Sequence, residues 1–222
     1  MAQQIILVGS IKGGVGKTSL SFNLAVQRAR AGHQVLLVDA DPQASSSMWA
    51  SARAEAGIMP ALVCVQKTGK IGMDLALLSE NYEVLIDAGG TDSLTLRQAI
   101  AVANQWIIPC RPGQLDLYSM SQMAQLLSDV RERVGQAPKT SIVLNAISPS
   151  TKEADEAREL LSDNPDMPVL GAQLVDRVAM RRAVMSGCGV TELTGKYASD
   201  AANTEMLQLY EEVFGEEFHA AS

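Results

Sequence analysis

A glycine-rich segment directly after an apolar run holds the residues best suited to chemistry. It reads Lys12-Gly13-Gly14-Val15-Gly16-Lys17-Thr18-Ser19, and it leads into a stretch rich in helix-forming residues. Glycines let successive backbone N–H groups curl toward a phosphate, and the start of a helix adds partial positive charge. Lys17 would reach the β- and γ-phosphates, and the Thr18 hydroxyl would ligate Mg²⁺. The segment therefore predicts a site for a nucleoside triphosphate and its metal ion.

One position departs from the generic phosphate-loop pattern, which has a glycine five residues before Gly16, where this chain has Ile11. A dinucleotide site is the alternative, because Asp39 lies at the end of the next apolar run, about where a ribose-binding acid would be. No complete G-x-G-x-x-G is present, however, and a Lys17-Thr18 pair suits a triphosphate with a metal. A turn that only connects a strand to a helix would not need Gly-Lys-Thr. We therefore favour the triphosphate.

The elements that must position this segment alternate along the whole chain. Seven aliphatic or β-branched runs are predicted to be strands: Ile5–Gly9, Gln34–Asp39, Ala61–Val65, Val84–Asp87, Gln105–Pro109, Ser141–Ala146 and Val169–Leu174. Eight stretches are predicted to be helices: Thr18–Ala31, Ala44–Ala56, Asp74–Leu78, Leu94–Ala103, Ser119–Val134, Glu153–Leu161, Met180–Met185 and Ala201–Phe214. Most strands are apolar throughout, as strands buried on both faces are. The pattern predicts an α/β fold with a doubly wound, mostly parallel sheet flanked by helices, in one domain over residues 1–222.

Two aspartates follow predicted strands closely. In an open parallel sheet, ligands bind at the carboxyl ends of the strands, and Asp41 and Asp87 fall at those ends, beside the glycine-rich segment. Either aspartate alone could simply be an acid that ends a buried strand. Their joint placement favours a functional role.

The glycine-rich segment, with Lys12 ahead of the glycines, resembles the deviant Walker A motif of the ParA/MinD family of P-loop ATPases. Four later segments, in the order and spacing of that family, resemble its switch segment, its Walker B strand and two segments of its small partition ATPases: Val38–Gln43, Val84–Gly90, Ile107–Leu117 and Asp176–Ala183. The resemblance extends from about Ile5 to Val190. Ile11 is then consistent with the family, since its partition branch often departs from the generic phosphate-loop pattern at this position too.

The resemblance implies roles for individual residues. Lys12 would reach the phosphates of a partner chain across an ATP-dependent homodimer. Asp41 would orient the attacking water, and Asp87 would lie near the Mg²⁺ shell. The implied residues are Lys12, Lys17 and Asp41 for catalysis, Lys12 to Ser19 and Asn145 for the nucleotide, and Thr18, Asp41 and Asp87 for the metal. Asn145 has an alternative reading as a strand-end turn residue. Without a tuned histidine nearby, we expect slow ATP hydrolysis.

Composition excludes several other classes of protein. The chain has 222 residues, of which 47% are hydrophobic and 19% charged, as in soluble globular proteins. Its three cysteines are scattered, and it has two histidines, which argues against a disulfide scaffold, a zinc site or a cysteine-ligated cluster. No apolar run approaches the length of a membrane span, and residues 1–4 lack the basic character of a signal peptide. We expect a cytoplasmic protein.

The net charge of −7 is concentrated at the C-terminal end. All 18 Lys and Arg lie at or before Lys196, whereas six acids and no bases lie from Asp200 onward. The rest of the chain is nearly neutral, with 19 acids and 18 bases. The last helix is amphipathic but acidic, so anionic lipid would repel it. We expect it to pack on the core through Met206, Leu209, Tyr210 and Val213 and not to bind a membrane.

Within the family, the chain resembles the small partition ATPases, because its first strand begins near Ile5 and leaves no room for a helix-turn-helix domain. The resemblance implies non-specific DNA binding by the ATP dimer, nucleoid association in that state and a centromere-binding partner. Candidate DNA contacts are five late bases that could gather on one face: Lys152, Arg158, Arg177, Arg181 and Arg182. The alternatives are positioning of a protein cargo, such as carboxysomes or chemoreceptor clusters, and a dethiobiotin-synthetase-like ligase.

Overall fold

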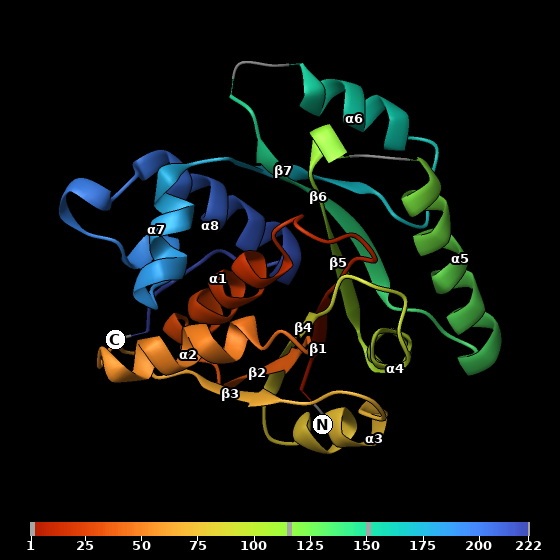
Figure 1. The fold of residues 1–222 in the computed structure, drawn as a ribbon, viewed down its shortest axis with the longest axis horizontal. Coiled ribbons are helices and arrows are strands. Elements are labelled where there is room, and N and C mark those ends of the chain that lie inside the picture. The colour runs from red at the N-terminus through yellow and green to blue at the C-terminus, as the bar shows by residue number, and fades with distance from the viewer. Residues whose placement is uncertain (1–2, 115–116, 150–151, 222) are drawn as a thin grey trace.

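A seven-stranded parallel sheet forms the centre of the protein in the computed structural model, which describes residues 3–114, 117–149 and 152–221 (Figure 1). Its strands are β1 (Ile5–Val8), β2 (Val35–Ala40), β3 (Val63–Gln66), β4 (Glu83–Ala88), β5 (Gln105–Cys110), β6 (Lys139–Ile147) and β7 (Val169–Val175). The strand order is β3-β2-β4-β1-β5-β6-β7, and each neighbouring pair is parallel. The predicted fold class is confirmed.

Helices cover both faces of the sheet (Figure 1). One layer holds α1 (Lys17–Arg30), α2 (Ser45–Glu55), α7 (Val178–Ser186) and α8 (Asp200–Phe214). The other holds α3 (Gly72–Leu78), α4 (Leu94–Val102), α5 (Leu117–Val134) and α6 (Glu153–Leu161). All predicted strands and helices are present, with bounds that differ by at most two residues. Three short 3-10 turns were not predicted: η1 (Pro112–Gln114), η2 (Val190–Glu192) and η3 (Gly195–Tyr197).

The central strands are buried on both faces, which explains their unbroken apolar runs. In β1, Ile5 and Leu7 pack into the core beneath α3 to α6, whereas Ile6 and Val8 pack into the core beneath α1, α2, α7 and α8. The last helix, α8, belongs to the second core. Its residues Met206, Leu209, Tyr210 and Val213 are buried, so the predicted packing of the acidic tail is confirmed. No helix in the described part of the chain is both long and apolar enough to cross a bilayer.

Because all strands run in the same direction, their carboxyl ends meet along one edge of the sheet. The segments that follow β1, β2 and β4 lie together there, since β1 and β2 both pair with β4. Part of the segment compared with the partition ATPases, at residues 115–116, lies outside the described residues. The fold thus brings the glycine-rich segment and the two strand-end aspartates to one place.

Candidate nucleotide-binding site

The glycine-rich segment forms an open loop between β1 and α1. Gly14 and Gly16 adopt left-handed backbone conformations, with φ of 73° and 91°, which L-residues other than glycine rarely adopt. A Cβ built on Gly13 or Gly14 would meet no described atom within 4 Å. Gly16 is the N-cap of α1 and supplies no side-chain cap to the first N–H groups of the helix. This combination suits a phosphate group.

Lys17 is the first residue of α1, and its side chain lies against this loop. Its side chain is buried, and its Nζ donates a hydrogen bond to the carbonyl oxygen of Lys12 at 2.7 Å. Burial lowers the pKa of Lys17, while the nearby charges of Asp87 and Asp41 oppose that shift. A Cβ on Gly90, after β4, would lie 3.1 Å from the same nitrogen. The β4 end therefore packs directly on the loop and keeps the ammonium group in place.

Two buried carboxylates lie beside the loop on adjacent strands. Asp39 on β2 and Asp87 on β4 are register partners, and both are 0% exposed. Asp87 accepts hydrogen bonds from Ser46 Oγ at 2.7 Å and Ser21 Oγ at 3.3 Å, and also from the Thr18 hydroxyl. Burial raises its pKa to about 6, and the hydroxyl donors limit the rise. Both carboxylates are thus held by specific donors and not solvated.

The residues around Asp87 fit a magnesium ion. Mg²⁺ prefers hard oxygen ligands, and it is commonly held by one or two carboxylates, a hydroxyl and the substrate phosphates. The Thr18 hydroxyl and the Asp87 carboxylate meet at the phosphate loop. No group of three or more His, Cys, Asp or Glu that could hold a metal without such help exists among the described residues. The donor set is therefore that of a metal brought in with a phosphate.

Asp41 lies at the edge of the same site and is only partly buried. Its Oδ1 accepts a hydrogen bond from the Gln43 N–H at 2.9 Å, and its backbone N–H donates to Asp39 Oδ1 at 3.2 Å. A Cβ on Gly89 would lie 3.6 Å from the Asp41 carboxyl carbon. Ala44, which follows, has a φ of 55°, an uncommon conformation for alanine that is often found at functional sites. The segment is thus folded against the end of β4.

Asn145 on β6 contacts the phosphate loop directly. Its side-chain amide donates to the Val15 carbonyl oxygen at 2.7 Å, and a Cβ on Gly16 would lie 2.2 Å from that amide nitrogen. The close approach explains why position 16 must lack a side chain. Asn145 also lines a cavity of about 160 Å³ with Gly16, Ser19, Met180 and Val184, among others. A mostly apolar cavity beside the loop suits a nucleotide base, but contact of Asn145 with the base remains a prediction.

Sequence reasoning missed several contributors. Asp39 was considered only as a ribose-binding acid or a strand-end acid, yet it accepts hydrogen bonds from the backbone of both Asp41 and Ser47. The hydroxyls of Ser21 and Ser46 were not singled out. Their one sequence signal is the occurrence of small polar residues in the first two turns of the helices that follow β1 and β2.

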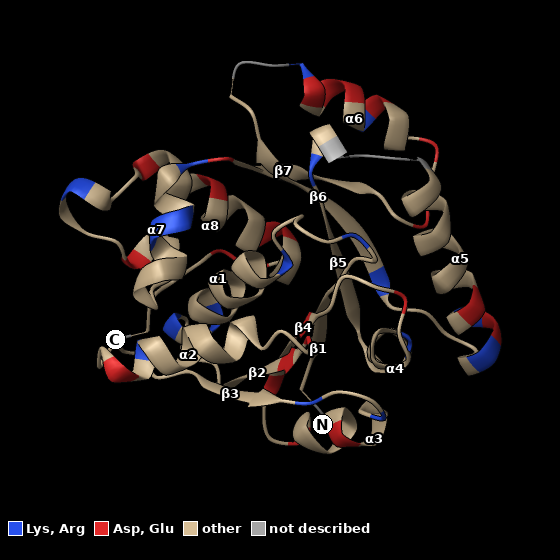
Figure 2. Cartoon of the chain, in the orientation of Figure 1, with Lys and Arg blue, Asp and Glu red and all other residues tan. Residues whose placement is uncertain are grey.

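The five candidate DNA contacts lie on helices of opposite layers, or beside them, and their contact with DNA remains a prediction. Lys152 and Arg158 lie on or beside α6, whereas the other three lie on or beside α7, in the opposite layer. Figure 2 shows Lys and Arg on both of these helices. Arg158 donates hydrogen bonds to the carbonyl oxygens of Leu170 and Gly171 at 2.6 and 2.9 Å. It therefore covers the open edge of β7, a structural role that the sequence pattern could not show.

The burial of Asp87 leads to a prediction about stability in the absence of nucleotide and metal. A carboxyl with a raised pKa binds its proton in the folded state at pH values where the unfolded chain has lost it. Stability should therefore fall as the pH rises from about 4 to about 6. Asp87→Asn should remove this loss of unfolding free energy, which is about 3 kcal/mol because the pKa differs by roughly two between the folded and unfolded states.

Urea unfolding of wild type and Asp87→Asn in EDTA, at pH 4.5 and pH 7.5, measures this effect. The stability difference between the two proteins should grow in favour of the variant as the pH rises. A difference that stays constant with pH would contradict the assignment of the raised pKa to Asp87.

Known proteins are similar to this chain in sequence and in fold. The family model described as CobQ/CobB/MinD/ParA nucleotide binding domain matches residues 6–190. The carboxysome distribution protein A of Gloeobacter kilaueensis is 32% identical over 89% of this chain and 88% of its own, and Protein ParA of Rhizobium radiobacter is 26% identical over 93% of each. The ATP complex of Cyanothece McdA has the same fold, with a TM-score of 0.78, 15% identity and 99% of both chains covered. The resemblance to the ParA/MinD family is thereby confirmed, and the chain belongs to the CobQ/CobB/MinD/ParA nucleotide-binding family.

Proposed function

We propose that this chain is a ParA-type ATPase, acting as one domain, which dimerises on ATP and hydrolyses it slowly to position a cargo. The observation that carries the proposal is the arrangement around Lys17. An open, glycine-rich helix start, a buried ammonium group and a buried carboxylate with hydroxyl donors meet at one point. Each of the three groups complements one part of a metal–triphosphate.

The chain's own residues account for most of the hydrolysis reaction. The N–H groups of the loop and Lys17 would bind the phosphates and compensate the charge that develops on their oxygens. When bound, Mg²⁺ would supply further charge compensation at the β- and γ-phosphates. Asp41 would orient the attacking water in line with the γ-phosphate. Since no strong base lies in this arrangement, turnover would be slow and suited to a timing role.

Lys12 would complete the site in a dimer. It is half-buried and precedes the exposed Gly13, and its carbonyl oxygen accepts the hydrogen bond from Lys17. A second cation from a partner chain is consistent with a site that is open on this side. Two family relatives are named Protein ParA and Chromosome-partitioning ATPase Soj.

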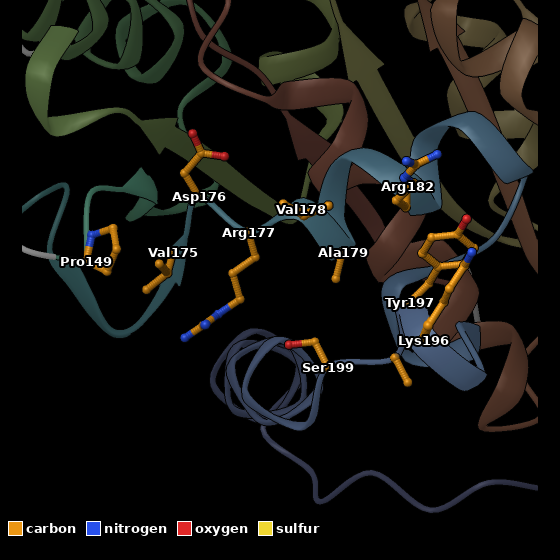
Figure 3. Close-up of a pocket in the computed structure, with 11 residues that line it drawn as sticks. Pro149, Val175, Asp176, Arg177, Val178, Ala179, Arg182, Lys196, Tyr197 and Ser199 are labelled. Atoms are coloured by element: carbon orange, nitrogen blue, oxygen red, sulfur yellow. The ribbon is translucent and has the colours of Figure 1, made fainter.

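Non-specific DNA would be contacted from the α7 side. Here a cavity of about 310 Å³ lies between the end of β7, α7 and η3. Figure 3 shows Arg182, Lys196 and Tyr197 at one end of it, and both cations lie 5.0 Å from the centre of the tyrosine ring. Cations at an open cavity rim suit phosphate contact. Lys196 was not singled out from the sequence.

The other two α7-side arginines have acidic partners. Arg177 binds Glu205 of α8 at 2.6 Å, and Arg181 forms an ion pair with Asp176. Each could contact DNA only at the expense of this pair. We therefore place Arg182 and Lys196 ahead of Arg177 and Arg181 in the proposed DNA surface.

The proposed cargo is plasmid or chromosomal DNA, held through a centromere-binding partner, with the ATPase cytoplasmic and nucleoid-associated in its ATP state. A protein cargo held through an adaptor is the second candidate. It is favoured by two relatives named for carboxysome distribution, at 32% and 29% identity. A ligase remains the third candidate. Cobyrinic acid a,c-diamide synthase from Mycobacterium smegmatis shares the fold at 15% identity and a TM-score of 0.71.

Lys12→Gln tests the dimer and the DNA contact together. The variant should bind ATP as a monomer but should fail to dimerise, because the cation that reaches the partner's phosphates is lost. DNA binding should fail with it, since the few phosphate contacts of one chain are too weak at physiological salt. Light scattering and DNA mobility shifts in ATP and in ADP, at rising salt, measure both effects.

Wild type is expected to dimerise and bind duplex DNA in ATP, and to release it in ADP or high salt. Lys139→Gln, at the exposed start of β6 on the far edge of the sheet from the site, is the matched control and should behave as wild type. A wild-type protein that stays monomeric in ATP and ignores DNA at low salt would favour the ligase.

A further inference from the structure

The start of α2 is tied to both buried carboxylates of the site. Ser46 is 0% exposed, and its Oγ donates to Asp87 Oδ2 at 2.7 Å. The backbone N–H of Ser47 donates to Asp39 Oδ2, also at 2.7 Å. The N-cap residue, Ala44, offers no side-chain cap of its own. The Asp39 carboxylate therefore takes the place of the usual cap at the positive end of this helix, and Asp87 holds the helix start through a side-chain hydroxyl.

The hydroxyl of Ser46 differs from those of other nearby serines in the acceptor of its hydrogen bond. A hydroxyl has one proton to donate, and within a helix it commonly goes to the carbonyl four residues back. Ser51 on α2 follows this habit and donates to the Ser47 carbonyl oxygen at 3.0 Å. Ser21 on α1 divides its proton between the Lys17 carbonyl oxygen, at 2.9 Å, and Asp87 Oδ1, at 3.3 Å. Of these three hydroxyls, that of Ser46 is the one committed to Asp87.

The helix that carries Ser46 is firmly held. Trp49, one turn further on, stacks on Phe22 of α1 with ring centres 4.4 Å apart and an angle of 11° between the rings. Arg53 is buried and makes a bidentate ion pair with Glu192 at 2.7 and 2.8 Å. A hydroxyl on such a support can fix the orientation of the group it contacts.

We propose that Ser46 is a positioning residue of the nucleotide site, which holds the Asp87 carboxylate in the orientation that a phosphate-bound metal needs. The inference rests on the proposed function. Removing a partner that orients a metal-binding group typically lowers metal affinity by about 10- to 100-fold. The loss should act through Asp87 and not through the fold as a whole.

The test measures binding of a non-hydrolysable ATP analogue by calorimetry, with MgCl₂ and with EDTA. Ser46→Ala should weaken the Mg²⁺-dependent binding by about tenfold or more, and leave the binding in EDTA unchanged. Ser51→Ala, on the exposed side of the same helix, should match wild type in both conditions. Thermal unfolding of all variants checks that each is folded.

A second variant pair separates positioning from packing. In the Asp87→Asn background, adding Ser46→Ala should cause no further loss of Mg²⁺-dependent binding, because the group it positions is no longer a carboxylate. Equal loss in Mg²⁺ and in EDTA, an unchanged Mg²⁺ dependence in Ser46→Ala, or an additive loss in the double variant would each overturn the inference. If wild type binds the analogue but the Ser46 variants do not behave as expected, the inference about Ser46 is overturned and the proposed function is not. If wild type does not bind the analogue, both the inference and the proposed function are overturned.

Discussion

Lys17→Ala is expected to abolish detectable ATP binding at micromolar concentrations. Lys17 is buried within the phosphate loop, and its ammonium group already points along the loop to the Lys12 carbonyl oxygen. Losing one partner of a buried charged contact costs about 2–5 kcal/mol. With about 1.4 kcal/mol for each factor of ten, affinity should fall by roughly 30- to 4,000-fold.

Calorimetry with ATP and MgCl₂ measures this loss directly. Lys70→Ala removes an exposed lysine from the turn before α3 and serves as the matched control, with wild-type affinity expected. The loop around Lys17 is also stabilised by the approach of Gly90, so thermal unfolding should confirm that the variant is folded. Micromolar affinity retained in folded Lys17→Ala would refute the phosphate-loop interpretation.

Asp41→Ala is expected to separate binding from hydrolysis. Asp41 lies at the rim of the site, where its carboxylate is fixed by the Gln43 N–H and lies against Gly89. The hydrogen bonds of Asp41 go to Asp39 and Gln43 of its own segment and not to the phosphate loop, so ATP and Mg²⁺ should still bind. Without a group that orients water, hydrolysis should slow by about 10²-fold or more.

Phosphate release and light scattering in ATP test this expectation together. The slow variant should accumulate as an ATP-bound dimer, because the step that resets it is blocked. Asp163→Ala, in an exposed turn after α6, is the control and should turn over as wild type does. Unchanged turnover in Asp41→Ala would show that another residue positions the water.

The sequence predicted the fold well because the signals that define it are local. Seven apolar runs and eight helical stretches were placed to within two residues, since strands buried on both faces require continuous apolar runs. The phosphate loop was also predicted correctly in position, because Gly-Lys-Thr after a strand is more than a simple turn requires. The edge strand β3 was also found, although its Val63 is 57% exposed.

What the sequence by itself determined, then, was the alternation of strands and helices, the phosphate loop and the aspartates at the strand ends. The tertiary structure decided which distant groups meet. Only strand pairing makes Asp39 and Asp87 neighbours, and only the packing of α2 on the sheet directs Ser46 to Asp87. The arginines of α6 and α7 are separated because their helices cover opposite faces of the sheet. Such contacts depend on crossover connections and layer packing, which join residues far apart in the chain and leave no local pattern in it.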